Sequence, residues 1–312
     1  MYQYSRISDN SYSELQQMQQ ACYGNAHTLT EFQNKYDTEV FGLKNTGFIA
    51  KDENGNSAAY YGVFPIIINY ESKSYLVAQS GDTMTVPKHR KKGLFVALAK
   101  ETYRLAHENG VRLVYGFPNQ NSYPGFKNKL DWSFCGYMQK FTIGSKALPL
   151  CELTYKFKIF RKAYNWLVHK RIQKYVIDTS PENIKDFNYS ETNGFVQKDE
   201  RFFSYKLRIP NVKLIEINGY KMLVKVSNHL HIGEIGRFDL TLVESLLASI
   251  KHLSVFLGCK KAIISISKNH WLYNSLSAKL NCEQNLPIGF YVYDNTFDTE
   301  KIQFCQADFD TF

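Results

Sequence analysis

The sequence has few features that could hold a metal or form a disulfide framework. Its six cysteines are scattered over 312 residues, with no C-x-x-C pair and no histidine cluster at metal-ligand spacing. They are Cys22, Cys135, Cys151, Cys259, Cys282 and Cys305. We therefore expect free thiols, no metal cofactor and the reducing environment of the cytoplasm.

Targeting and membrane-spanning signals are absent from the sequence pattern as well. Residues 1–20 are polar, unlike a signal peptide, and no apolar run approaches the roughly 20 residues that a membrane-spanning helix needs. With 44% hydrophobic and 21% charged residues, the composition excludes a wholly disordered, collagen-like or mucin-like chain. We expect a globular cytoplasmic protein with two domains of about 150 residues each.

Acidic residues are in deficit, because 29 Asp and Glu oppose 38 Lys and Arg, a net charge of +9. Most of this surplus lies between residues 140 and 174, where nine cationic residues face Glu152 alone. The nine are Lys140, Lys146, Lys156, Lys158, Arg161, Lys162, Lys170, Arg171 and Lys174. Because the rest of the chain is nearly neutral, the sequence does not have the pattern of a general nucleic-acid binder.

This basic segment also has a helical hydrophobic period. Apolar residues recur at steps of three and four, with Lys and Arg on the flanks, as in an amphipathic helix. They are Phe157, Phe160, Tyr164, Val168, Ile172 and Tyr175. Three interpretations stay open: a helix between domains with its lysines in water, an anchor that makes peripheral contact with the inner membrane surface, or a patch that attracts anionic acceptors. The base-stacking aromatics that single-stranded nucleic acid requires are not evident.

Hydrophobic periodicity and turn signals predict a mixed α/β domain in residues 1–142. The predicted strands are 2–7, 47–50, 58–70, 74–86, 111–117 and 134–142, and the predicted helices are 11–23, 28–36, 94–108 and 122–130. The resulting order, β-α-α-β-β-β-α-β-α-β, is typical of an α/β fold with a central mixed sheet.

The second half repeats part of this order. Predicted strands at 221–226, 262–267 and 288–293 alternate with predicted helices at 240–256 and 270–280. The sequence Lys129-Leu130-Asp131-Trp132 corresponds to Lys279-Leu280-Asn281-Cys282 at an offset of 150 residues. We therefore predict two copies of one αβα domain, at 1–142 and 180–312, joined by the basic amphipathic segment 143–179.

The turn at 87–93 has the chemistry of an anion site. A long predicted strand runs into Pro87-Lys88-His89-Arg90-Lys91-Lys92-Gly93, and a strong helix follows at once. The first turn of a helix presents unpaired backbone N–H groups and the positive end of the helix dipole. Gly93 would let the backbone approach a bound group closely, and the turn suits a pyrophosphate. A solvated basic turn is the competing interpretation.

At these residues the sequence resembles a known family. The Arg90-x-x-Gly93 turn is similar to the acyl-CoA loop, Arg/Gln-x-x-Gly-x-Gly/Ala, of the GNAT (Gcn5-related) N-acetyltransferase superfamily. The run from Phe117-Pro118-Asn119 to Lys129-Leu130-Asp131-Trp132 resembles its second signature, and the element order of 1–142 is also similar. The arrangement in two halves resembles tandem proteins of this superfamily, here with a degenerate C-terminal copy.

The resemblance implies a binding site for acetyl-CoA as co-substrate. The strand before the loop would hold the thioester carbonyl through backbone amides, and the loop amides would hold the pyrophosphate. The residues implied are Met84, Thr85, Val86, Arg90, Lys91, Lys92, Gly93, Leu94 and Phe95, with Asn119, Asn121 and Phe126 on the facing side. A substrate amine would attack the thioester directly, so no nucleophilic side chain is required.

Two positions depart from the family pattern. Phe95 stands where the loop motif ends in Gly or Ala, and Lys127 stands where a Tyr usually protonates the leaving thiolate. Tyr123, one helical turn earlier, is our candidate general acid, with a packing aromatic as the alternative. Asp82, on the strand that reaches the acyl site, is the candidate general base, although a turn carboxylate is an equally ordinary role.

The second half carries no such loop. The segment corresponding to the loop is 231–239, and it contains the acidic residues Glu234 and Asp239. Two carboxylates would repel a pyrophosphate, so we predict that this half does not bind acyl-CoA.

The sequence thus predicts an N-acyltransferase that transfers an acetyl group from CoA to a small-molecule amine. The two-copy resemblance suggests an amino sugar or its nucleotide derivative as acceptor. A FemABX-like aminoacyl transferase that uses charged tRNA is an alternative, although a tRNA donor needs no pyrophosphate loop. A pseudo-enzyme that binds CoA without catalysis is a third possibility.

Overall fold

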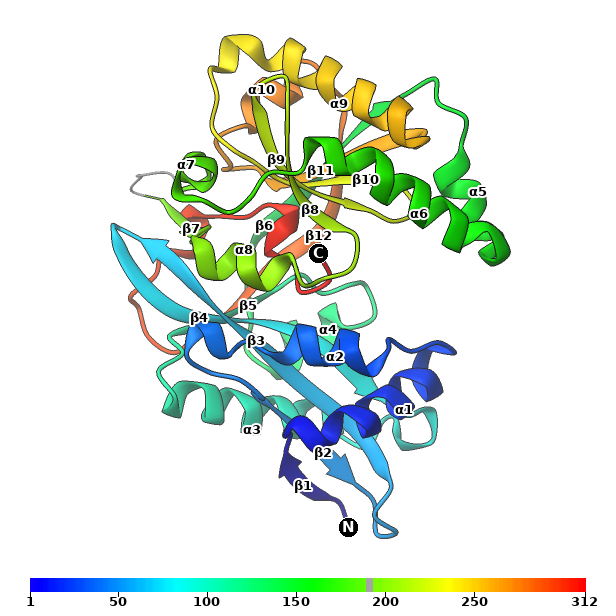
Figure 1. Cartoon of the computed structure of the whole chain (residues 1–312). Helices are drawn as coiled ribbons and strands as arrows, with labels where there is room; N and C mark the ends of the chain where they lie inside the picture. Colours follow the sequence, from blue (N-terminus) through cyan, green and yellow to red (C-terminus); the bar gives the residue numbers. More distant parts are fainter. Residues whose placement is uncertain (189–192) are drawn as a thin grey trace. The chain divides into compact units, whose positions relative to one another are not determined.

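A computed structural model describes residues 1–188 and 193–312, without the side chains of Tyr155 and Lys158. The chain divides into two compact units that are not contiguous in sequence (Figure 1). The first unit contains 1–136, 192–196 and 286–302, and the second contains 137–191, 197–285 and 303–312. The predicted α/β class with mixed sheets is confirmed, whereas the two-copy ancestry behind the division at 142 and 179 stays a prediction.

In the first unit, helices cover both faces of a mixed sheet. Its helices are η1 (Asp9–Ser11), α1 (Tyr12–Tyr23), α2 (Leu29–Tyr36), η2 (Glu39–Phe41), η3 (Pro87–His89), α3 (Leu94–Glu108), α4 (Tyr123–Lys129) and η8 (Thr299–Lys301). Its strands are β1 (Gln3–Arg6), β2 (Gly47–Lys51), β3 (Ser57–Tyr70), β4 (Lys73–Thr85), β5 (Leu113–Gly116), β7 (Gly194–Val196) and most of β12 (Cys282–Val292). The sheet order is β1-β2-β3-β4-β5-β12, with β7 beside β3.

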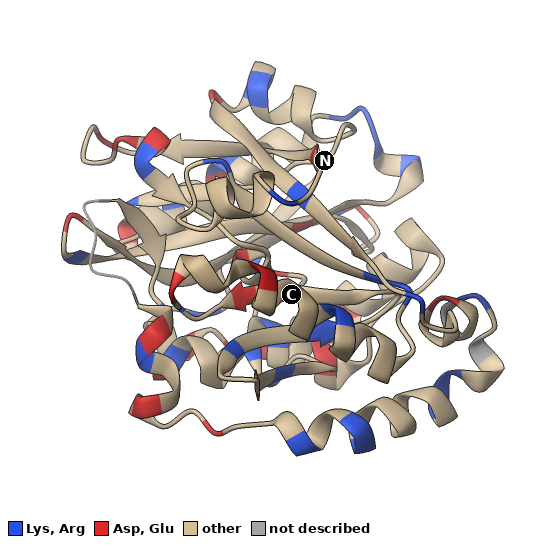
Figure 2. Ribbon diagram, turned by 90° about the horizontal axis from the view of Figure 1, so that it is seen from above, with Lys and Arg blue, Asp and Glu red and all other residues tan. Residues whose placement is uncertain are grey.

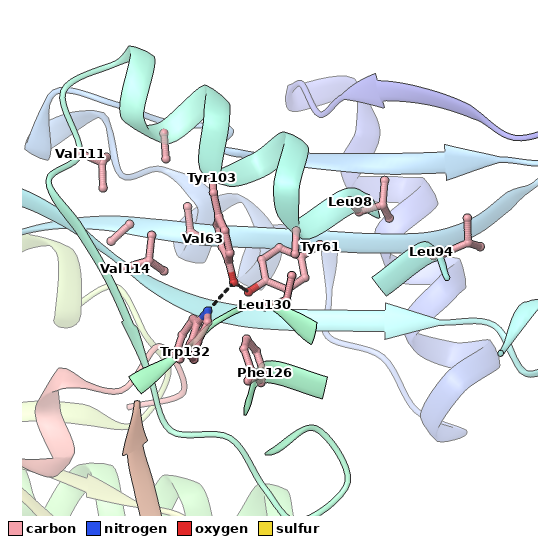
Figure 3. Close-up of a cluster of buried hydrophobic side chains, with 14 of the residues drawn as sticks. Tyr61, Val63, Leu94, Leu98, Tyr103, Val111, Val114, Phe126, Leu130 and Trp132 are labelled. Carbon is pink, nitrogen blue, oxygen red and sulfur yellow. Dashed lines mark hydrogen bonds between the residues drawn. The ribbon is translucent and has the colours of Figure 1, made fainter. Parts of the chain in front are cut away.

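The layering follows from the alternation of side chains along β3. Tyr61 and Val63 point into a core beneath α3, whereas Tyr60 and Phe64 point into a second core beneath α1 and α2. The first core also contains a series of buried hydrogen bonds (Figure 3). Trp132 Nε1 donates to the Tyr103 hydroxyl at 3.0 Å, and the Tyr103 and Tyr61 hydroxyls are hydrogen-bonded at 2.6 Å. Both faces of β3 are therefore buried, as the near-continuous apolar run in its sequence requires.

In the second unit the sheet order is β6-β11-β10-β9-β8. Its strands are most of β6 (Ser133–Gly144), β8 (Val212–Ile217), β9 (Tyr220–Val226), β10 (Leu230–Ile235) and β11 (Lys261–Ser267), and the short β13 (Ile302–Gln303) lies at the unit boundary. Its helices are α5 (Leu150–Lys156), η4 (Lys158–Phe160), α6 (Arg161–Ile172), η5 (Gln173–Tyr175), α7 (Pro181–Ile184), η6 (Lys185–Phe187), α8 (Glu200–Lys206), η7 (Leu240–Leu242), α9 (Val243–Leu257), α10 (Tyr273–Ser277) and η9 (Gln306–Asp308).

The last strand of each predicted copy lies in the other unit. We expected 134–142 to complete the first sheet, but β6 pairs antiparallel with β11, from Lys261↔Gly144 to Ser267↔Met138. The edge of β5 is instead covered by β12, with Gly289 opposite Gly116 and Val292 opposite Leu113. Both strands follow a short helix and both can complete an antiparallel pair, so the local pattern does not distinguish them.

Our expectation that no apolar run approaches the length of a membrane-spanning helix is wrong for η7 and α9. Within the described part of the chain, Leu240–Leu257 is long and apolar enough to cross a membrane, with a mean hydropathy of 1.5 over 18 residues. Leu246, Ile250 and Leu253 of this segment are fully buried in the second unit. Core helices of globular domains pass the same test, so we infer no membrane span from it.

Candidate functional site

Strands β4 and β5 of the first unit separate where the sequence predicted an acyl-CoA site. They are parallel and pair at Ala78↔Val114 and Gln79↔Tyr115. Beyond this pairing a cleft of about 560 Å³ opens. Its lining comes from α1, the end of β4, the basic turn, the first turn of α3, the segment before α4 and α4 itself: Cys22, Tyr23, Thr83, Thr85, Arg90, Phe95, Asn119, Asn121, Ser122 and Gly125.

A bulge in β4 sets the direction of its last residues. The register with β3 shifts between Gly62↔Gly81 and Tyr60↔Met84, and Asp82 has a positive φ of 51°. After the bulge, Val86 donates its amide to Ala58 O at 3.0 Å, so this amide is used inside the sheet and not, as we predicted, at a thioester. Because successive amides alternate between the two edges of a strand, that of Thr85 faces the cleft side.

The other two predicted β4 positions lie away from the cleft. Met84 is buried in the core beneath α1 and α2. Asp82 binds Lys35, with Nζ 2.7 Å from Oδ1, and accepts a hydrogen bond from the Tyr36 hydroxyl at 3.0 Å. Burial and the charge of Asp82 raise the pKa of Tyr36 well above its ordinary value, so Tyr36 remains a donor. The Asp82 carboxylate is therefore engaged by two residues of α2, and it is not among the residues that line the cleft.

The basic turn is anchored from beneath by a residue that the sequence analysis did not select. His89 is buried, and its Nδ1 lies 2.8 Å from the Tyr2 hydroxyl. Desolvation, then the charges of Lys88 and Lys92, lower the pKa of His89, which favours the neutral ring. Arg90 lines the cleft and donates from Nε to Thr85 O at 3.4 Å, whereas Lys91 and Lys92 are exposed beside it.

The N-terminus of α3 has the geometry predicted for an anion site. Gly93 caps the helix at φ 76°, a left-handed conformation in which a side chain is strained. The first helical bond runs from Ala97 N to Gly93 O, so the amides of residues 94–96 have no partner within the helix. Leu94 is buried in the core, and Phe95 both lines the cleft and packs edge-on against Phe126 at 5.2 Å.

The facing wall is formed by the segment before α4. Asn119 Oδ1 accepts hydrogen bonds from the amides of Asn121 and Ser122, at 2.9 and 3.2 Å, which fixes the turn that lines the cleft. Phe126 is buried beneath α3 and does not line it (Figure 3). Tyr123 also lies outside the lining, because its ring packs against Phe134 with centroids 4.5 Å apart. That position does not favour our assignment of Tyr123 as general acid.

Helix α1 contributes two lining residues that sequence reasoning missed. Tyr23 is 60% exposed and donates its hydroxyl to Thr83 O at 3.2 Å, and Cys22 lies beside it. Burial raises the pKa of both groups, so phenol and thiol are protonated at neutral pH. The helical period of 12–23 places these residues at the end of α1, but it does not show what that end faces.

The second unit has the same parallel pair, with its own chain in the opening. Strand β10 pairs with β11 from Leu230↔Ala262 to Ile232↔Ile264 and then bulges. Cys305 bridges to Ile266, and a side chain on Gly233 would meet the Phe312 ring at 2.2 Å. Residues 303–312 therefore lie against β10 and β11 of the second unit, at the position that corresponds to the open cleft beside β4 in the first unit.

The acidic residues of this half need a correction. We treated 231–239 as a loop, but residues up to Ile235 belong to β10, whose apolar residues are buried between β9 and β11. Glu234 is buried, with its Oε2 atom 3.6 Å from Lys198 Nζ and its Oε1 atom 3.7 Å from His270 Nε2. Asp239 is the N-cap residue of η7. The two carboxylates are thus engaged within the second unit, and the absence of acyl-CoA binding in this half stays a prediction.

The donor set of the described residues contains no group of three or more His, Cys, Asp or Glu that could hold a metal ion. The polar groups of the cleft lining are hydroxyls, the side-chain amides of Asn119 and Asn121, the Cys22 thiol and the Arg90 guanidinium.

Comparisons with known proteins concern one domain of the first unit and the fold of the chain. Residues 3–135 match the family described as acetyltransferase (GNAT) domain. No curated protein matches the chain. Among solved structures, a GCN5-related N-acetyltransferase from Kribbella flavida has a TM-score of 0.58 at 10% identity, covering 94% of this chain and 71% of its own. A probable N-acyltransferase from Enterococcus faecalis V583 has a TM-score of 0.59 at 12% identity, covering 94% and 73%.

A third similar structure has a bound acyl-CoA. Saccharomyces cerevisiae N-myristoyltransferase with bound myristoyl-CoA has a TM-score of 0.55 at 9% identity, covering 93% of this chain and 82% of its own. At such identities the likeness concerns the fold. Residues 3–135 thus match a GNAT acetyltransferase domain, and these neighbours show that the chain shares its fold with GNAT proteins and with an N-myristoyltransferase.

Proposed function

We propose that the protein is an acyl-CoA-dependent N-acyltransferase whose first unit transfers an acetyl group to a primary amine. The observation that carries this proposal is the cleft between β4 and β5, with Arg90 and the unpaired α3 amides at one end. These groups would hold the CoA pyrophosphate, and the Thr85 amide would face the thioester carbonyl. Amides aimed at the developing oxyanion are typically the largest electrostatic contribution to acyl transfer.

Protonation of the leaving thiolate is assigned to Tyr23 in this proposal. Tyr23 lines the cleft, and its hydroxyl donates a hydrogen bond to Thr83 O. The Tyr123 ring, by contrast, packs against Phe134. The raised pKa of Tyr23 keeps its proton available at neutral pH. Because Asp82 is engaged by Lys35 and Tyr36, we propose that the amine loses its proton to water.

The acceptor proposed is an amino sugar or a nucleotide-linked amino sugar, and the compartment proposed is the cytoplasm. A tRNA-dependent transferase is less well supported, because it would have no use for a pyrophosphate site at Gly93. A CoA-binding protein without catalysis is the second candidate. Phe95 favours it, because this large side chain stands where the loop motif of the family ends in Gly or Ala. Its ring lies in the cleft so close to Gly125 that a Cβ there would be 2.9 Å from Phe95 Cε1.

Calorimetry with acetyl-CoA tests the binding site through two matched substitutions. Asn and Asp both tolerate a left-handed φ, so Gly93→Asn controls for the backbone and Gly93→Asp adds only a charge. We expect Gly93→Asp to bind at least about tenfold more weakly than Gly93→Asn, a difference of about 1.4 kcal/mol. Equal affinities, or no binding by the native chain at about 1 mM, would exclude this site.

Turnover separates the enzyme from the pseudo-enzyme. Release of free CoA should be measured with simple amines, amino sugars and nucleotide amino sugars, each beside the corresponding alcohol. Amine-dependent release supports N-acyl transfer. Tight binding of acetyl-CoA without release on the whole panel supports the second candidate.

A further inference from the structure

The turn between α5 and α6 in the second unit exposes a group of large apolar side chains. Ile159 is 84% exposed and Phe160 is 63% exposed. Four neighbours in the same stretch are also exposed: Leu148, Leu153, Phe157 and Trp166. We call these six residues the apolar tip. Monomeric proteins rarely expose so many large apolar side chains within one short stretch unless it is part of an interaction site.

The apolar tip is not an unfinished part of the core. The predicted helix over 157–175 is present as the succession of η4, α6 and η5, and α5 ends before it at Lys156. The inward face of α6 is buried through Tyr164, Val168 and Ile172, and Tyr164 donates to Leu257 O at 3.0 Å. The side chains of the tip therefore belong to a different face from the one that packs on the second unit.

A cavity of about 540 Å³ lies between α5 and the helical segment formed by η4 and α6. Its lining is almost wholly apolar: Leu150, Leu153, Thr154, Phe157, Phe160, Ala163, Tyr164 and Leu167. Exposed apolar side chains of this kind can enter the boundary between headgroups and acyl chains of a membrane.

Lys and Arg recur along the helical segment from Lys156 to Lys174 that contains most of the apolar tip, and Figure 2 marks the Lys and Arg positions of the ribbon in blue. Lys156, Lys162, Lys170 and Lys174 form no ion pair with the described residues. Lys170 Nζ lies 4.9 Å from the centroid of the Trp166 ring, so a cation accompanies an exposed indole. The acid of the segment is engaged elsewhere, since Glu152 accepts from Lys260 N at 3.1 Å. Lys158 belongs to the predicted basic segment, but its side chain lies outside the description.

We propose that the apolar tip and its lysines dock the protein on a membrane surface that contains anionic phospholipids. The apolar side chains would enter the interface between headgroups and acyl chains, and the lysines would contact headgroup phosphates. Trp166 beside Lys170 suits this boundary, because an indole has an apolar body and a polar N–H. This inference concerns the second unit and does not depend on the acyl-transfer proposal.

Vesicle sedimentation tests the proposal on the full chain. Vesicles of phosphatidylcholine alone are compared with vesicles of phosphatidylcholine and phosphatidylglycerol, at low and high salt. We expect binding to the anionic vesicles that weakens with salt. The double variant Ile159→Ser/Phe160→Ser and the double variant Lys162→Glu/Lys170→Glu should each bind about tenfold more weakly.

Matched controls come from the same unit. Leu242→Ser removes a side chain that is 50% exposed on η7, and Lys251→Glu reverses an exposed charge on α9, both outside the apolar tip. Both controls should bind vesicles like the native chain, and near-UV circular dichroism checks that every variant is folded. Trp166 supplies a local signal, since its fluorescence should shift to the blue with anionic vesicles and Trp166→Phe should remove that shift.

Three results would overturn the proposal. The first is no sedimentation with anionic vesicles. The second is equal binding by the native chain and the Ile159/Phe160 variant. The third is a concentration-dependent dimer in sedimentation velocity that this variant abolishes while no vesicle binding occurs, because the tip would then be a contact between two copies of the chain.

Discussion

Tyr23 and Tyr123 are the two tyrosines that compete for the role of general acid. Tyr23 lines the cleft, whereas Tyr123 packs against Phe134. We expect Tyr23→Phe to lower kcat by about 100-fold, because positioned acids contribute about 100- to 10,000-fold, and Tyr123→Phe to change it little. Steady-state kinetics across pH test this assignment, since loss of an acid also removes the alkaline limb of the profile. A larger effect at Tyr123 would restore the original assignment.

Asp82 is the second residue whose role the structure changes. Asn also tolerates its positive φ, so Asp82→Asn removes the charge while it spares the bulge. We expect it to lower the free energy of unfolding in urea by about 1–3 kcal/mol, because the Lys35 ammonium, 11% exposed, loses its partner. Acyl transfer by the folded variant should continue within about tenfold of the native rate, whereas a loss of about 100-fold or more would indicate a general base.

The candidate site was predictable from sequence where it depends on neighbours along the chain. Gly93, Arg90 and Asn119 belong to turns whose residues define the backbone locally, so a motif predicts them. The ion pair of Asp82 with Lys35 joins residues 47 positions apart, and no local pattern reports it. The same is true of Tyr23, which a helical period places on α1 but not beside Thr83.

At the scale of elements, β12 is the strand whose placement matters most. A side chain on Gly289 would lie 2.5 Å from Phe134 Cε1 and 2.8 Å from Trp132 Cε3. We expect Gly289→Ala to destabilise the protein by about 1–3 kcal/mol through overpacking. Gly144→Ala on β6 is the control, because nothing lies within 4 Å of the added carbon. Equal stability of the two variants in urea would contradict the packing described for β12.

The stability of the region formed by β10 and the segment 303–312 should depend on pH through His231. Burial, then the charge of His229, lowers the pKa of His231 to about 4, while the ordinary value is 6.5. Below pH 6.5 the unfolded chain takes up a proton that the native state does not, so stability falls as pH falls. Between pH 7 and pH 5 we expect a loss of about 2 kcal/mol in urea unfolding.

His231→Gln should reduce this loss. Other groups with depressed pKa values, such as His89, remain in the variant and account for any residual slope. An unchanged slope between pH 7 and pH 5 would show that the native state holds the proton on His231 as readily as the unfolded chain.

At the scale of the whole molecule, the first unit requires residues from the end of the chain. Tyr291 stacks on Tyr103 with centroids 4.5 Å apart, and the Tyr293 hydroxyl donates to Tyr103 O at 2.7 Å. A chain limited to 1–142 lacks these residues and leaves the edge of β5 unpaired. We expect it to aggregate or to lack near-UV circular dichroism.

The control is residues 1–136 joined through a flexible linker to 286–302, which restores the strand. This chain should be monomeric in size-exclusion chromatography and should bind acetyl-CoA. A stable, CoA-binding 1–142 would show that β12 is dispensable.

The sequence by itself determined most elements, the basic turn and the α/β class, because these depend on the period of apolar residues and on turn residues a few positions apart. Only the tertiary structure decided that β12 covers β5, that β6 covers β11, and that 303–312 enters the second unit. Strands with similar alternation can pair with several edges, and the choice is made by long-range packing such as Phe134 and Trp132 against Gly289.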